Sequence, residues 1–107
     1  MLIFRSAALS DVGRVRSENE DRFLHDEAAG FYGVADGVGG LPGGAEAAER
    51  AVERLLAALR AAGATGMVDL PACFQAVNRE VRELGRQLSP ETGIGTTLTA
   101  GLLRSDV

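Results

Sequence analysis

Three carboxylic acids, Glu20, Asp21 and Asp36, have a spacing in the sequence that suggests chemistry. Glu20 and Asp21 close the polar stretch GRVRSENED at residues 13–21, whereas Asp36 follows the apolar run FYGVA at 31–35. Acids that a fold brings together repel one another, so solvent or a bound cation must compensate their charges. The elements around these residues decide whether the acids meet.

A β-hairpin is the element that would bring the acids together. Residues 22–26 and 31–35 are predicted strands, and the sequence EAAG between them predicts a turn in which glycine supplies a positive φ. With the turn centred on the two alanines, the predicted pairs are Asp21 with Asp36, Arg22 with Ala35 and Phe23 with Val34. A three-residue loop would shift this register by about one position. In either register, Glu20 and the two aspartates gather at one end of the hairpin.

The chemistry of such a cluster points to a hard metal ion. Carboxylate and carbonyl oxygens, with no nearby histidine or thiol, suit magnesium or manganese. Gly37 has no side chain, so its carbonyl could turn toward an ion that Asp36 holds. The alternative is that the acids are simply solvated at the end of a sheet, and the spacing alone does not decide between the two.

Arg16 carries the complementary charge four residues before Glu20. Its stretch is too polar for a core strand, so the guanidinium could reach the mouth of the acidic cluster and offer a planar fork to two phosphate oxygens. A salt bridge to Glu18 or Glu20 is the competing interpretation. A metal ion and an arginine together would suit a phosphoryl substrate.

The glycine-rich stretch GVADGVGGLPGG at 33–44 has two other interpretations. A dinucleotide fingerprint beginning at Gly37 requires glycine at position 42, where Pro42 stands, and the phosphate-binding P-loop requires a lysine that the chain lacks. A plain turn fits the Asp-Gly dipeptide well. The nucleotide-binding motifs are therefore excluded, whereas the turn and the metal site remain.

The rest of the sequence predicts two helices and two further strands. Apolar residues recur in steps of three and four over 45–62, which predicts a helix ending at Gly63, and again over 70–88, after the capping residue Asp69 and with Pro71 in the first turn. Residues 3–9 and 97–102 have the pattern of strands. The predicted fold class is α+β, with antiparallel sheet and an antiparallel helix pair whose apolar faces form the core.

Composition excludes several classes of function. The 107 residues carry a net charge of −4 without a basic stripe, so we expect neither a nucleic-acid partner nor an anionic membrane partner. All basic residues are arginine, which excludes lysine Schiff-base chemistry. The single cysteine, Cys73, permits no internal disulfide and lies beside an apolar stripe, so we expect it in the core of a cytoplasmic protein. No signal peptide or membrane anchor is predicted.

Three stretches, SDVGRVRSENED, VADGVGG and GIGTTLTAGLL, resemble in this order the N-terminal motifs of the metal-dependent Ser/Thr protein phosphatases, the type 2C or PPM family, in their bacterial form. The resemblance covers residues 10–103 and implies the N-terminal half of an α-β-β-α sandwich. It implies hydrolysis of phosphoserine and phosphothreonine in proteins, with a Ser/Thr kinase as a further partner. It also implies two magnesium or manganese ions in the complete domain, held through Asp36 and the Gly37 carbonyl. Glu20 and Asp21 would order water around these ions, and Arg16 would hold the substrate phosphate.

The sequence departs from the family pattern in two places. Val38 stands where many eukaryotic members have a histidine that is a candidate proton donor, and the only histidine, His25, falls in a predicted strand, so no general acid is assigned. The family's later metal ligands are aspartates, whereas only Asp69 and Asp106 follow Asp36 here. We therefore expect residues 1–107 to be one incomplete phosphatase domain. The alternative is a non-catalytic binding or regulatory module, although its metal and phosphate residues would then be expected to be lost.

Overall fold

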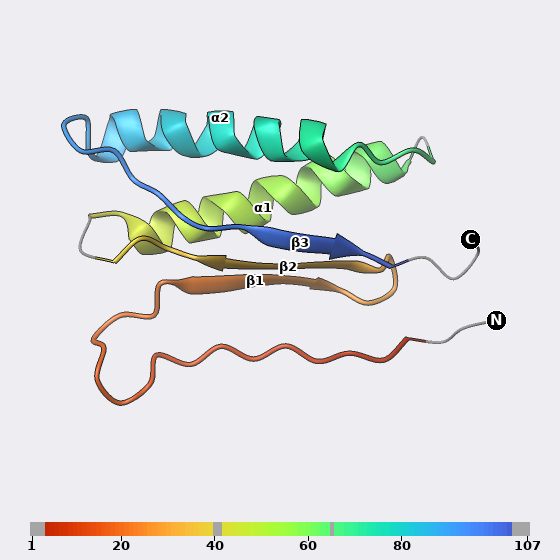
Figure 1. Ribbon diagram of the computed structural model, residues 1–107, viewed down its shortest axis with the longest axis horizontal. Coiled ribbons are helices and arrows are strands. Elements are labelled where there is room, and N and C mark those ends of the chain that lie inside the picture. Colours follow the sequence, from red (N-terminus) through yellow and green to blue (C-terminus); the bar gives the residue numbers. More distant parts are fainter. Residues whose placement is uncertain (1–3, 40–41, 65, 104–107) are drawn as a thin grey trace.

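The computed structural model describes residues 4–39, 42–64 and 66–103. Its elements follow the order β1 (Asp21–Asp26), β2 (Phe31–Asp36), α1 (Gly44–Gly63), α2 (Leu70–Leu88) and β3 (Thr99–Leu102). The three strands form one antiparallel sheet in the order β1-β2-β3, and both helices lie on the same side of it (Figure 1). The predicted α+β class is confirmed.

The hairpin has the register that its turn sequence predicted. Asp21 is opposite Asp36, and the pairing continues to Asp26 opposite Phe31. Gly30 adopts a φ of 75°, and its N–H donates to the carbonyl of Glu27 at 3.2 Å. The turn therefore closes with two alanines at its tip, and this closure fixes which residues meet at the far end of the strands.

Helix α1 supplies the side of the core that covers the sheet. It begins after Gly43, which adopts a φ of 86°, and its buried stripe includes Ala48, Val52, Leu55 and Leu59. Small alanine side chains let the helix approach β1 and β2 closely, and α1 contacts both strands. The expected end of the helix at Gly63 is confirmed.

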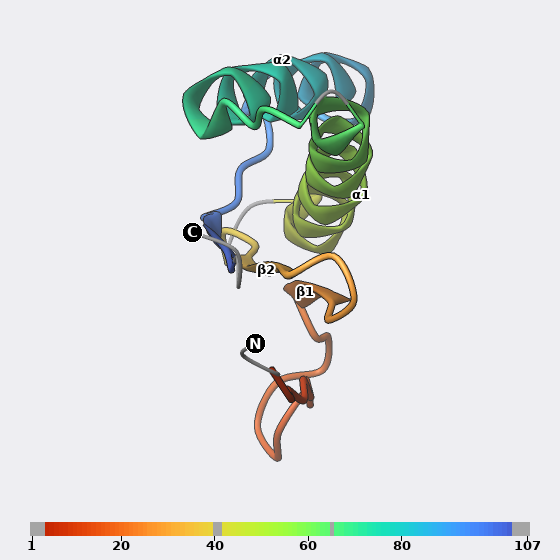
Figure 2. The ribbon, with the colours of Figure 1, turned by 90° about the vertical axis from the view of Figure 1, so that its right-hand side faces the viewer.

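Helix α2 packs on α1 rather than on the sheet. The Asp69 side chain accepts the N–H of Ala72 at 3.1 Å, which caps the helix as expected, and the helix ends before Ser89. It runs back along α1 in the opposite direction (Figure 1) and lies above it in the second view (Figure 2). Cys73 is buried in this helix pair, as predicted.

The two faces of the sheet differ. Leu24, Phe31 and Ala35 point toward α1 and are buried. On the other face, the residues Phe23 and Val34 are 40% and 60% exposed. Both views show the N-terminal segment on this second side, away from the helices (Figures 1 and 2). We call the helix-free side the open face.

The strand expected over residues 3–9 is not observed. Residue 3 lies outside the described residues, and residues 4–9 are assigned to no strand. A strand needs a neighbour for its backbone hydrogen bonds, and the described sheet places none beside this segment. The strand expected over 97–102 begins only at Thr99, because its first residues join β2 irregularly.

Candidate functional site

Asp21 and Asp36 meet at the end of the hairpin, on the open face. They line a hollow of about 370 Å³ together with Leu9, Ser10 and Thr97. The N-terminal segment therefore forms one wall of the hollow and the ends of β1 and β2 form the other. The sequence-based pairing of these two aspartates is confirmed.

One oxygen of the Asp21 carboxylate stands out among the described residues. Its Oδ1 is buried and has no hydrogen-bond partner among the described residues. The backbone beside it is well held, because the Asp21 N–H donates to Asn19 Oδ1 at 3.0 Å. A buried, charged oxygen normally has a donor or a cation as its neighbour. This orphaned oxygen is what a divalent cation at the site would satisfy.

Asp36 is fixed through its backbone and leaves its side chain exposed. Its N–H donates to Thr97 Oγ1 at 3.0 Å, and its carbonyl accepts the Thr97 N–H at 2.9 Å. Its side chain lies on the same face as that of Asp21, because residues directly opposite each other in an antiparallel pair share a face. The Asp36 carboxylate therefore opens toward solvent beside the half-buried Asp21.

Glu20 departs from the expected cluster. A Cβ atom added to Gly44 would collide with the Glu20 carboxylate, so this carboxylate lies against the first residue of α1, on the helix side of the sheet. The N-terminus of a helix attracts an anion, and neighbouring residues of an extended chain point to opposite faces. Among the described residues, no group of three or more histidine, cysteine, aspartate or glutamate side chains forms a metal site. The two aspartates thus lie together as expected, whereas the Glu20 carboxylate lies apart from them.

Gly37 is required by packing in addition to any role of its carbonyl. It is buried, and its N–H donates to the carbonyl of Glu20 at 2.9 Å. A Cβ atom at this position would collide with the backbone of Gly44. The glycine therefore lets the start of α1 approach the end of β2. The proposed ion contact of its carbonyl stays a prediction.

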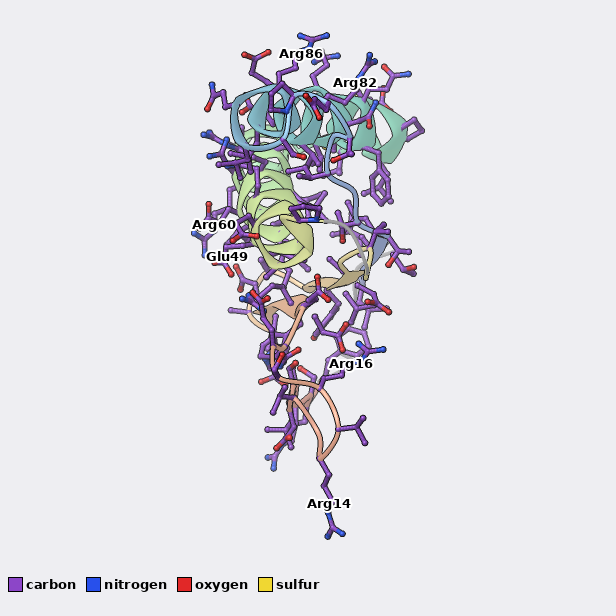
Figure 3. All side chains as sticks on the ribbon, turned by 90° about the vertical axis from the view of Figure 1, so that its left-hand side faces the viewer. Arg14, Arg16, Glu49, Arg60, Arg82 and Arg86 are labelled. Carbon is purple, nitrogen blue, oxygen red and sulfur yellow. The ribbon has the colours of Figure 1, made fainter. Side chains whose placement is uncertain are left out.

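Arg16 is exposed in the loop that precedes β1. In the view onto the end of the hairpin, it lies between the loop tip and the sheet, whereas Arg14 points away (Figure 3). Within the described part of the chain, Arg16 makes no ion pair, so the alternative salt bridges to Glu18 and Glu20 are not formed. The guanidinium is free to take a ligand from solvent.

Arg22 is a structural residue of the site that the sequence did not single out. Its Nη1 donates to the carbonyls of Asn19 and Asp21 at 2.7 and 2.8 Å, and its Nε donates to Glu49 Oε2 at 2.7 Å. This side chain ties the bend before β1 to helix α1. The sequence did indicate that Arg22 lies on the helix-facing side of β1. It did not indicate the hydrogen-bond partners of Arg22, because tertiary packing brings Glu49 beside it.

His25 lies away from the two aspartates. It pairs with Tyr32 near the turn end of the hairpin, and its Nε2 is 2.6 Å from Ser6 Oγ. This contact ties the N-terminal segment to the open face and places no imidazole beside Asp36. The expectation that His25 is structural agrees with this position. Asp106, the last aspartate of the sequence, lies outside the described residues.

Neither α1 nor α2 contains, within the described residues, a stretch apolar enough to cross a lipid bilayer.

Solved structures of phosphatases match the fold. No protein-family model matches the chain, and no curated protein matches it. The PPM Ser-Thr phosphatase MsPP from Mycobacterium smegmatis, solved in complex with cacodylate, is 34% identical over 96% of this chain, with a TM-score of 0.79. The catalytic domain of the Ser/Thr phosphatase PstP, solved with two manganese ions, is 29% identical over 92%, with a TM-score of 0.72. PppA, a regulatory component of the type VI secretion system in Pseudomonas aeruginosa, is 30% identical over 94%, with a TM-score of 0.64.

The match covers nearly all of this chain but less than half of its relatives. The chain spans 41%, 43% and 44% of MsPP, PstP and PppA, respectively. The matched part contains the hairpin, the helix pair and the strand that follows them. In sequence and in fold, the chain therefore corresponds to the N-terminal part of the PPM Ser/Thr phosphatases.

Proposed function

We propose that this chain provides the first part of a metal-dependent centre that hydrolyses phosphoserine and phosphothreonine in proteins. The observation that carries the proposal is the facing pair of Asp21 and Asp36, with a buried Asp21 oxygen that lacks a partner among the described residues. The likeness to phosphatases supports the choice of reaction, and the two manganese ions of PstP support the choice of metal.

Each site residue has a role in this proposal. Asp36 and the Gly37 carbonyl would hold the two magnesium or manganese ions of the complete domain. Asp21 and Glu20 order the surrounding water, and Glu20 does so from the helix side. Arg16 holds the phosphate of the substrate. When bound, the cations supply an activated water and neutralise the charge of the transferring phosphoryl group.

The proposed partners are phosphoproteins and the Ser/Thr kinase that modifies them. The acidic character of the chain, with a net charge of −4, does not favour nucleic acid as a ligand. A buried, unpaired Cys73 fits a reducing compartment, and we place the protein in the cytoplasm. A non-catalytic, regulatory module is the second candidate, because no three-acid metal group forms within the described residues.

Hydrolysis of a phosphothreonine peptide by the full-length gene product tests the proposal. We expect activity with manganese and none with a chelator, and we expect Asp36→Asn to lower activity by about a hundredfold, because it removes a charged metal ligand. The exposed α1 residue Glu53 provides a matched control, and Glu53→Gln should act like the wild type. Equal activity of Asp36→Asn and the wild type would remove Asp36 from the mechanism. Metal binding without turnover would favour the regulatory module.

A further inference from the structure

The junction between β2 and β3 departs from a regular ladder at Asp36. At the hydrogen-bonded positions of an antiparallel ladder, two opposite residues exchange both N–H···O bonds, and Asp36 and Thr97 occupy such a position because the Thr97 N–H donates to the Asp36 carbonyl. Here, the Asp36 N–H donates to the side-chain oxygen of Thr97 at 3.0 Å instead. The Thr97 carbonyl accepts a different donor, the hydroxyl of Thr96, at 2.8 Å. A hydroxyl therefore replaces a backbone acceptor at the residue proposed to hold the cations.

Thr97 contacts both backbone polar groups of Asp36. Its N–H donates to the Asp36 carbonyl at 2.9 Å, and its hydroxyl lies 3.3 Å from the same oxygen. The next two residues are held by other segments, because Gly37 donates to Glu20 and Val38 donates to Gly95. The N–H and the carbonyl of Asp36 both hydrogen-bond to Thr97. The Thr97 hydroxyl therefore acts together with the Thr97 N–H to set the direction of the Asp36 Cα–Cβ bond.

We propose that Thr97 is a positioning residue for Asp36. Its hydroxyl sets the backbone at the end of β2 so that the Asp36 carboxylate enters the hollow beside Asp21, which Thr97 also lines. Partners that orient a metal ligand commonly change metal affinity by about 10- to 100-fold when they are removed. The inference rests on the proposed function, because the cation is what makes the orientation of Asp36 matter.

Thr99 offers a matched control on the same strand. It lies two residues after Thr97 on the same face, and its own backbone pairs with Val34. Among the described residues, the Thr99 hydroxyl has no hydrogen-bond partner. Replacement of either threonine by valine keeps the β-branched shape and removes only the hydroxyl. The two variants therefore separate loss of the Asp36 contact from a general effect on β3.

Isothermal titration of the chain with manganese chloride tests the proposal. We expect Thr97→Val to weaken manganese binding about tenfold, Thr97→Ser to stay within about threefold of the wild type because it keeps the hydroxyl, and Thr99→Val to match the wild type. Thermal unfolding in chelator monitors the fold of each variant. Should Thr97→Val fail to fold, Thr97→Ala against Thr97→Ser gives the same comparison.

The outcomes separate this inference from the proposed function. Equal manganese affinity of Thr97→Val and the wild type overturns the role of Thr97 and leaves the metal centre standing. An equal loss in Thr97→Val and Thr99→Val also overturns it, because the effect then belongs to the strand. Absence of manganese binding by the wild type overturns the inference, because Asp36 then orients no ion, whereas the proposed function is decided by the phosphatase activity of the full-length gene product.

Discussion

The facing aspartates lower the stability of the metal-free chain. Like charges directly opposite each other on a sheet are unfavourable by about 0.2–1 kcal/mol. The buried Asp21 oxygen, which has no partner among the described residues, adds a desolvation cost. A pair that opposes folding in this way is typical of a functional site, where local stability is lower than the sequence could provide.

The repulsion between the two aspartates predicts that Asp36→Asn changes the free energy of unfolding differently in chelator and in manganese. In chelator, Asp36→Asn should raise the free energy of unfolding by about 0.5 kcal/mol, because it removes the charge repulsion with Asp21. With manganese, the wild type should gain stability and the variant should gain little, because only the wild type binds the ion. Urea denaturation followed by circular dichroism measures both effects. A variant that is less stable than the wild type in chelator contradicts the repulsion.

At the scale of elements, the site depends on the close approach of the first residue of α1 to the end of β2. Gly37 provides this approach, because any side chain there would collide with the Gly44 backbone. Gly37→Ala should therefore destabilise the chain by about 1–3 kcal/mol. Gly101 is the control, because a Cβ atom there meets nothing within 4 Å. Gly101→Ala should be close to neutral in the same urea denaturation experiment. Equal stabilities of the two variants would show that α1 does not need this contact.

The parts of the fold that local sequence determines were predictable. A turn centred on the two alanines of EAAG predicted the observed pairing of Asp21 with Asp36, whereas a three-residue loop would have shifted it by about one position. Apolar spacing and the Asp69 cap were sufficient to locate both helices. In each case, the residues that determine the structure lie close together in the sequence.

The parts that depend on distant contacts were not predictable. Residues 4–9 have the composition of a strand, but a strand also needs a neighbour, and the sequence does not specify one. The Glu20 carboxylate lies on the helix side because α1 starts beside it, 24 residues later in the chain at Gly44. Likewise, the hydroxyl of Thr97 reaches Asp36 across 61 positions. No local pattern indicates such contacts.

At the scale of the whole molecule, the sheet is covered on one face only. The helices cover one side, and the other presents Phe23 and Val34 to solvent (Figure 2). The radius of gyration of 14.9 Å exceeds the value of about 13 Å that is typical of a compact chain of about 100 residues. The chain also spans only 41–44% of the three matched proteins. We therefore expect the 107 residues alone to bind one ion weakly rather than two ions tightly.

Paramagnetic broadening by manganese in the amide NMR spectrum of the chain locates the bound cation. We expect small amounts of manganese to broaden the signals of Asp21, Asp36 and Gly37 first, because the ion would lie among their oxygens. Signals of α2, which packs on α1 and not on the sheet, should remain sharp. Broadening centred on the exposed acids of α1, such as Glu49 and Glu53, or spread evenly over the chain, would contradict a cation site at the end of the hairpin.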